Sequence, residues 1–333
     1  MLRIGVDVDR TDTTQVSAAQ QSPVAWPSLE RSIAWAATQD YLHLVTQMLG
    51  KLRLALAAPL PGWSHASLAL TPRGLTTRSL PSENGSVEAT LDLVDRVIRV
   101  TSSDGQTRTV EVVPARPVAE IWAEFRRALA DLGIDVDLPD KPQERADVTP
   151  FSEDRRGRTY DAALAAGWLA LLTELNAMFD EFRSPFFGRS NVGFWWGGFD
   201  LSVVLFNGRH AAPRAGSNYI LRYDHDAEHL SVGFWPGDDD HEAMFFAYLV
   251  PEPIECAQYP INVETAGWAP AMGEWVMPYP ALLEAENRVA DVRQFMDCVL
   301  AAARDLGGWD LESLTYVAPP RSSRSPHQRV DGR

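Results

Sequence analysis

The same spacing of apolar residues occurs twice in this chain, 174 positions apart. In residues 118–132 and again in residues 292–306, the apolar positions fall on one face of a helix. Both stretches end in Asp-Leu-Gly, and glycine readily adopts the left-handed backbone that closes a helix. We therefore predict two matching amphipathic helices, one near the end of each half of the chain.

A second repeat lies upstream, with a shift of 133 positions. It aligns Trp63 with Trp196, and Asp95 with Glu228. Because the two shifts differ, the second copy should carry an insertion, which we place at residues 251–291. Chance similarity between α+β segments is the alternative explanation, since few residues are identical between the copies.

The resulting fold class is α+β: two tandem repeats of helix, antiparallel strands and helix, packed as one two-lobed unit. The first repeat spans residues 26–140 and the second spans residues 159–316, with a charged connection at residues 141–158. Residues 1–25 and 317–333 are polar and lack periodicity, so we expect both segments to be disordered.

Short apolar or alternating runs bounded by turn residues predict the strands. In the first repeat these runs are residues 52–57, 67–71, 87–93, 97–102 and 107–113. In the second repeat they are residues 199–206, 219–224, 229–234 and 243–250.

The 333-residue chain has a net charge of −15, which bears on its partners. An acidic field repels nucleic acids and anionic membranes, so we predict neither as a partner. The apolar run at residues 162–172 is too short to span a bilayer. Two cysteines, Cys256 and Cys298, make no disulfide framework, which favours a cytoplasmic protein. The oligomeric state stays open.

Two segments rich in aromatic residues and glycine indicate where a site would lie. They read Phe-Trp-Trp-Gly-Gly-Phe-Asp-Leu at residues 194–201 and Gly-Phe-Trp-Pro-Gly at residues 233–237. Rigid rings beside residues without side chains let a backbone approach a ligand closely. We predict a cleft with aromatic walls, as is usual for small-molecule sites. The wall residues are Trp63, Trp196, Phe199 and Trp235.

Asp200 has two interpretations. Strand alternation places Asp200 and Ser202 on one face, close to Trp196. The carboxylate could act as a general acid or base whose pKa the rings raise. It could instead accept hydrogen bonds from the backbone of Gly197 and Gly198, and this structural role is the one we favour.

Glu228 is the second candidate for acid–base chemistry. A pair formed with Asp200 would suit glycoside hydrolysis or isomerisation. Alternation turns Glu228 and His229 to opposite faces of their strand, and we expect His229 to be solvated. His43 and His65 are expected to be hydrogen-bonded core histidines, and His65 is also the polar residue that the first repeat would bring to the cleft.

No metal and no cofactor are predicted. Residues 223–229 hold the densest set of carboxylates and histidines, but the His-Glu-x-x-His spacing is missing. The acidic turn at residues 238–241 is expected to be solvated. Gly-x-Ser-x-Gly, a P-loop and a dinucleotide-binding glycine fingerprint after a strand are also missing.

Several motifs occur in an order that resembles a known family. They include Leu42-His43 with Gln47 and Gly50-Lys51, Ser103-Asp104-Gly105, Trp196-Gly197 with Phe199-Asp200-Leu201, Gly208-Arg209, Pro251-Glu252-Pro253 and Trp309-Asp310. Over residues 26–309 the chain resembles the bacterial family known as domain of unknown function 5996, and this resemblance implies no activity. The family tends to have histidine at the positions of Gly62, Gly157 and Gly193, and arginine at Leu205, which weighs against catalysis that depends on those positions.

Three functions follow from these observations. The pattern favours a protein that binds a small polar or sugar-like molecule, with His65, Asp200 and Glu228 as the polar groups of the cleft. The first alternative is an acid–base enzyme, a hydrolase or an isomerase, that uses Asp200 and Glu228. The second alternative is a non-catalytic structural or interaction protein whose aromatic residues only form its core.

Overall fold

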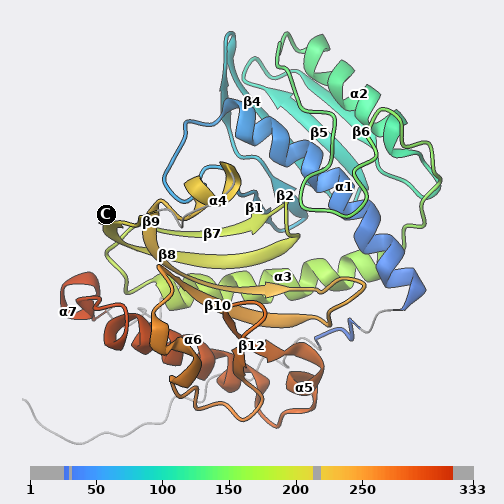
Figure 1. Ribbon diagram of the computed structural model, residues 1–333. Helices are drawn as coiled ribbons and strands as arrows, with labels where there is room; N and C mark the ends of the chain where they lie inside the picture. The colour runs from blue at the N-terminus through green and yellow to red at the C-terminus, as the bar shows by residue number, and fades with distance from the viewer. Residues whose placement is uncertain (1–25, 30–31, 213–218, 318–333) are drawn as a thin grey trace, which may run out of the picture.

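The computed structural model describes residues 26–29, 32–212 and 219–317 (Figure 1). Within these residues it contains seven α-helices, one short 3-10 helix and two six-stranded antiparallel sheets. The α+β class predicted from the sequence is confirmed. The expectations for residues 1–25 and 318–333 lie outside the described residues.

The first half of the chain builds one sheet that packs against two helices. Helix α1 (Ile33–Leu56) begins at Ser32, whose side chain accepts a hydrogen bond from the backbone N–H of Trp35. Its strands are β1 (Ala69–Thr71), β2 (Gly74–Thr76), β3 (Leu80–Ser82), β4 (Gly85–Asp92), β5 (Val97–Ser102) and β6 (Thr107–Glu111). They are ordered β1-β2-β4-β5-β6, with β3 also paired to β4. Helix α2 (Val118–Asp131) packs on β5 and β6.

The second half of the chain contains the other sheet and five of the seven described α-helices. Helix α3 (Ala162–Arg183) is capped by the Asp161 side chain. The remaining elements are β7 (Ser190–Trp195), β8 (Asp200–His210), α4 (Tyr219–Asp224), β9 (Ala227–Trp235), β10 (Met244–Val250), η1 (Ile254–Gln258), β11 (Gly267–Ala269), β12 (Glu274–Pro278), α5 (Tyr279–Glu284), α6 (Arg288–Asp305) and α7 (Leu311–Leu314). The sheet order is β11-β12-β10-β9-β8-β7, so residues 251–291 extend the sheet through β12 and β11.

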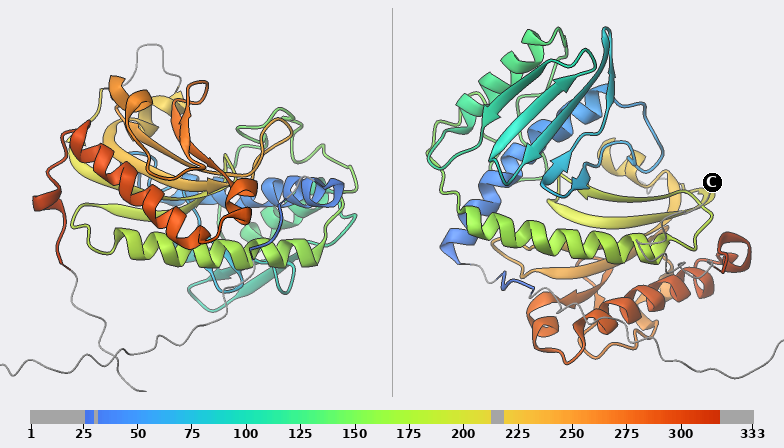
Figure 2. Two further views of the ribbon diagram at one scale, coloured as in Figure 1. Left: turned by 90° about the horizontal axis from the view of Figure 1, so that it is seen from below. Right: turned by 180° about the vertical axis from the view of Figure 1, so that it is seen from behind.

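The two sheets meet at their edges. Leu68, just before β1, and Phe194 in β7 exchange backbone hydrogen bonds of 2.8 and 2.9 Å. α3 and α6 cover one face of the second sheet, and α1 packs against both the first sheet and α3 (Figures 1 and 2). One cluster of buried apolar side chains runs through both halves, so the protein packs as a single unit.

Two predicted strands are helical. Residues 52–57 continue α1, which ends at Leu56 because Pro59 disfavours the helical backbone of the residue before it. Residues 219–224 form the short helix α4 instead of a strand. By contrast, the two matching amphipathic helices predicted at residues 118–132 and 292–306 are confirmed as α2 and α6.

Helix α3 is long and apolar enough to cross a membrane by length and composition alone. In this structure its apolar side chains Trp168, Leu172 and Phe179 are buried, and the helix packs on β7 and β8. The buried helix of a protein core can be equally long and apolar, and the burial of these side chains indicates that α3 is a core helix.

Candidate functional site

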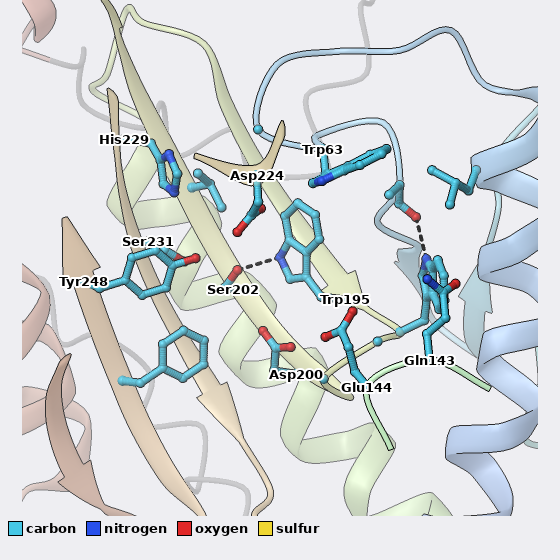
Figure 3. A pocket seen from close by; sticks show the side chains of 18 residues that line it. Trp63, Gln143, Glu144, Trp195, Asp200, Ser202, Asp224, His229, Ser231 and Tyr248 are labelled. Atoms are coloured by element: carbon cyan, nitrogen blue, oxygen red, sulfur yellow. Dashed lines mark hydrogen bonds between the residues drawn. The ribbon is translucent and has the colours of Figure 1, made fainter. Parts of the chain in front are cut away.

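A cavity of about 460 Å³ lies on the face of the second sheet that α3 and α6 leave uncovered (Figure 3). Its floor is formed by β8, β9 and β10. Its sides come from the turn before β1, which carries Trp63, and from the connection between the halves, which carries Gln143 and Glu144. Segments from both halves therefore enclose the same space.

Strand alternation decides which side chains face this cavity. Asp200, Ser202 and Val204 of β8 line it, as the alternation of residues 199–206 predicts. The register places Ser231 of β9 between Val204 and Tyr248 of β10. The intervening residues of the same strands are apolar and pack toward the helices. The polar groups are therefore gathered on one face by the pleat of the sheet.

Gly197 and Gly198 make room for two carboxylates. A Cβ added at Gly197 would lie 2.3 Å from Oε1 of Glu144, and one added at Gly198 would lie 2.7 Å from Oδ1 of Asp200. Real Cβ atoms do not approach other atoms so closely, so any other residue would displace these groups. The Gly-Gly pair therefore lets the carboxyl groups of Glu144 and Asp200 face the same space (Figure 3).

Helix α1 holds Glu144 in place. The Gln47 side chain bonds both the N–H and the C=O of Gln143, at 2.8 Å each. Next to it, Arg145 pairs with Asp40. Glu144 itself has φ +54°, a left-handed conformation that costs a non-glycine residue energy. The residues on both sides of Glu144 are therefore anchored to α1, and Glu144 itself is strained and directs its side chain into the cavity.

His43 is a structural part of this support. Arg145 donates to Nδ1 at 3.0 Å, so Nε2 carries the proton and donates to the carbonyl of Gly197 at 2.8 Å. Burial, followed by the charge of Arg145, lowers the pKa of His43 to about 4. A neutral His43 therefore ties α1 to the Gly-Gly turn, as expected for a hydrogen-bonded core histidine.

The carboxyl groups of the cavity repel one another. Burial, then the charge of Glu144, raises the pKa of Asp200 well above its ordinary value. Burial, then the charge of Asp224, also raises the pKa of Glu144. Burial alone raises the pKa of Glu274 to about 7. These groups therefore share a poorly solvated space in which full ionisation is unfavourable.

The nearby arginines do not neutralise this cluster. Arg145 and Arg158 both pair with Asp40, and Arg158 also pairs with Asp154. Arg156 pairs with Asp147 and Asp154. Among the described residues, no ion pair with lysine or arginine reaches the carboxylates that face the cavity. Those carboxylates belong to Asp200, Glu144 and Asp224, and within the described part of the chain Glu274 in the adjoining cavity has no such ion pair either.

His229 lies inside the cavity and is not solvated as the sequence suggested. It is only 2% exposed, and its Nδ1 lies 2.9 Å from the carbonyl oxygen of Ala227, to which it must donate. Burial lowers its pKa. Ser202 accepts a 2.7 Å hydrogen bond from the indole N–H of Trp195, which fixes that ring in the cavity wall (Figure 3).

A second cavity of about 750 Å³ adjoins the first at Asp200 and Glu144. It is lined by Gln39, Trp235 and Glu274, together with the charged side chains of the connection. The carboxyl groups of Asp200 and Glu144 therefore lie at the boundary between the first cavity, which has aromatic walls, and the second cavity, which is lined by charged side chains.

The structure brings together only some of the residues predicted for the site. Trp63, Trp196 and Asp200 line the first cavity, and Trp235 lines the second. Phe199 is buried in the core, stacked on Trp168 at 4.8 Å between ring centroids.

His65 and Glu228 lie outside both cavity linings. The backbone N–H of Leu60 donates to Nδ1 of His65 at 3.0 Å. Glu228 pairs with Arg209 and accepts a hydrogen bond from Asn207, at 2.7 Å each. Alternation turns Glu228 away from the face that carries His229, so the structure does not form the expected pair of Asp200 and Glu228. The carboxylate that accompanies Asp200 is Glu144.

Comparison with known proteins gives one match. A model described as "Family of unknown function (DUF5996)" matches residues 26–316. No curated protein and no solved structure matches the chain.

Proposed function

The chain belongs to the family of unknown function DUF5996, and from that premise we propose that it binds a small polar molecule in the cavity beside Asp200. The observation that carries this proposal is the pair of carboxyl groups held over Gly197 and Gly198 without a basic partner. A pair that served only stability would be neutralised, because unpaired buried charge destabilises a fold. Aromatic walls around a few convergent polar groups are the usual composition of a ligand site.

Backbone strain around the cavity supports the same proposal. Among the described residues, six non-glycine residues have a left-handed φ, and three of them adjoin this site: Trp63, Glu144 and Phe199. Each such residue costs on the order of 1–3 kcal/mol unless glycine-like freedom is available. The strained residues fix the aromatic ring of Trp63, the carboxylate of Glu144 and the backbone of Phe199 next to Asp200. Side chains fixed in this way before a ligand binds are characteristic of a preorganised site.

A second candidate function is acid–base catalysis by Asp200 and Glu144. Burial and the charge of Glu144 raise the pKa of Asp200, which favours the protonated carboxyl group that a proton donor to a leaving group needs. Glu144 would then be the partner base, in place of Glu228. A purely structural role for the aromatic residues accounts for Phe199 but not for the rings of Trp63 and Trp195, which line the cavity.

A thermal-shift screen of small polar metabolites tests the binding proposal. A ligand at about 100 times its Kd should stabilise the protein by about 2.7 kcal/mol, which corresponds to several degrees in Tm. Asp200→Asn should abolish this shift, whereas Glu228→Gln, the same chemical change outside the cavity, should preserve it. Conversion of the ligand by the wild type, with Asp200→Asn inactive, would favour the enzyme. A flat screen, or equal shifts in both variants, would count against the site.

We also propose that the two halves are copies of one helix–strand–helix unit. The support is that each half begins with a long helix, continues as an antiparallel meander and ends with a matching amphipathic helix, α2 or α6. A cytoplasmic location and the lack of a nucleic-acid or membrane partner stay expectations that rest on the net charge of −15.

A further inference from the structure

We propose that the cavity selects an organic cation, whose ammonium or guanidinium group lies among the carboxylates of Asp200, Glu144 and Asp224. This inference rests on the proposed binding function and names the class of ligand. It is narrower than the polar or sugar-like ligand expected from the sequence.

The first argument is the shortage of positive charge. The three arginines that line the adjoining cavity, Arg145, Arg156 and Arg158, are already paired with carboxylates outside the cluster, namely Asp40, Asp147 or Asp154. Lys51 donates to the Gln143 side chain at 3.1 Å, and burial lowers its pKa to about 8. The described part of the chain therefore offers the cluster no strong cation of its own, and a cationic ligand would supply one.

The second argument is His229, which is independent of the carboxylates. Its Nδ1 donates to the Ala227 carbonyl, so Nε2 is the unprotonated nitrogen and can only accept. Within the described residues Nε2 has no hydrogen-bond partner, although the side chain is 98% buried and lines the cavity (Figure 3). The atom is therefore an acceptor that is open to the cavity, and an N–H of a ligand would bond to it.

The third argument concerns the indole groups. Trp195 donates its N–H to Ser202, and Trp196 donates its N–H to the carbonyl of Ala66 at 3.0 Å. Both donors are therefore used within the protein, and the rings meet the cavity as carbon surface. Aromatic surface next to carboxylates suits ammonium and guanidinium groups through cation–π attraction.

The spread of the acceptors argues for an organic cation over a metal ion. In the part of the chain that the structure describes, no three His, Cys, Asp or Glu side chains converge closely enough to hold a metal ion. The acceptors instead follow the cavity wall from His229 past Asp224 to Asp200 and Glu144 (Figure 3). A ligand with several N–H donors spaced along its length matches that arrangement.

Binding of a cation should release protons from this cluster. Without ligand, the pKa of Glu274, raised to about 7, keeps this carboxyl group partly protonated near neutral pH, and burial raises the pKa of Asp200 in the same direction. A cation favours the ionised forms, so each bound cation displaces protons. Affinity should therefore rise with pH up to and beyond about 7, the value for Glu274.

Titration calorimetry with defined probes tests the inference. We would titrate agmatine and spermidine as cations, and sorbitol and 1,5-pentanediol as neutral controls, at physiological salt. Measurement in two buffers of different ionisation enthalpy gives the number of protons released. We expect the cations to bind with proton release, and the neutral probes to bind at least tenfold more weakly.

Three variants separate the cavity from the acidic surface. Asp200→Asn and Glu144→Gln should each weaken cation binding about 10-fold to 100-fold, the usual effect of losing a charge-assisted hydrogen bond. Glu228→Gln should bind as the wild type does. If cations bind equally well to all three variants, general attraction to an acidic protein explains them and the inference fails.

The remaining outcomes distinguish the inference from the binding proposal beneath it. Binding of only the neutral probes, dependent on Asp200, would overturn the cationic class and leave the proposed site standing. Binding of none of the four probes would overturn the cationic class, and the proposed function would then depend on the metabolite screen alone.

Discussion

Replacing Gly50 by Ala is expected to destabilise the protein by about 1–3 kcal/mol, the usual cost of overpacking a core. Gly50 lies inside α1, where alanine ordinarily stabilises a helix by up to about 1 kcal/mol relative to glycine. Here the added methyl group would lie 2.2 Å from the indole ring of Trp196. The ring and the Gly-Gly turn behind it would have to move, so the ordinary gain becomes a loss.

Gly167→Ala is the matched control. Gly167 also lies inside a long helix, α3, but a Cβ there would meet only Pro27, at an ordinary contact distance of 3.8 Å. This variant should therefore gain roughly 0.5–1 kcal/mol. Urea unfolding of the wild type and both variants measures the two effects. Stabilisation by both substitutions would contradict the packing of Trp196 against α1.

Asp200→Asn is expected to stabilise the protein without ligand at pH 8 and to have little effect at pH 4. The pKa of Asp200 is raised in the folded state, first by burial and then by Glu144. As pH rises above the ordinary value of 3.8, the unfolded chain loses this proton while the folded protein retains it. Wild-type stability therefore falls with rising pH until the folded pKa is passed, and asparagine removes that loss.

The gain at pH 8 should be about 1–2 kcal/mol, the usual size when a destabilising functional group is replaced. Thermal unfolding of the wild type and variant across pH 4–8 measures it. Glu228→Gln serves as the control and should show no such pH-dependent gain, because Glu228 is neutralised by Arg209. An Asp200→Asn variant that is less stable than the wild type at pH 8 would show that the carboxylate is structural.

Local patterns predicted β8, β9 and β10 of the second sheet and missed β7, β11 and β12. The alternation in residues 199–206 placed Asp200 and Ser202 on one face because side-chain direction in a strand depends only on position. The prediction failed at residues 219–224, where apolar residues suit a strand but the chain forms a helical turn. A short apolar run does not distinguish these two structures without tertiary contacts.

The partner of Asp200 could not be predicted from local pattern. Glu144 lies in the charged connection and is held at the cavity by Gln47, which pairs with the backbone of Gln143, and by the pair of Arg145 with Asp40. One signal was present: Gln47 and Lys51 are polar residues one turn apart on α1, and both are buried. Buried polar groups need partners, so these two residues implied that a polar segment packs on this helix.

Glu228 was selected as a carboxylate that precedes the strand ending in Gly-Phe-Trp-Pro-Gly and that could pair with Asp200. Proximity to a strand does not fix which way a side chain points, and one residue along a strand reverses the face. His229, the next residue, was the one directed into the cavity. The sequence thus identified the strand that carries the site and missed the face.

The central claim is that Asp200 and Glu144 form a carboxyl pair kept without a counter-charge in a ligand cavity. The most direct measurement is an NMR titration of the protein labelled with ¹³C at the aspartate carboxyl carbon, with Asp200→Asn used to assign the signal. We expect Asp200 to titrate well above its ordinary 3.8 and to move to lower pH when agmatine is added. A carboxyl group that titrates near 3.8 and does not respond to a cation would contradict the account.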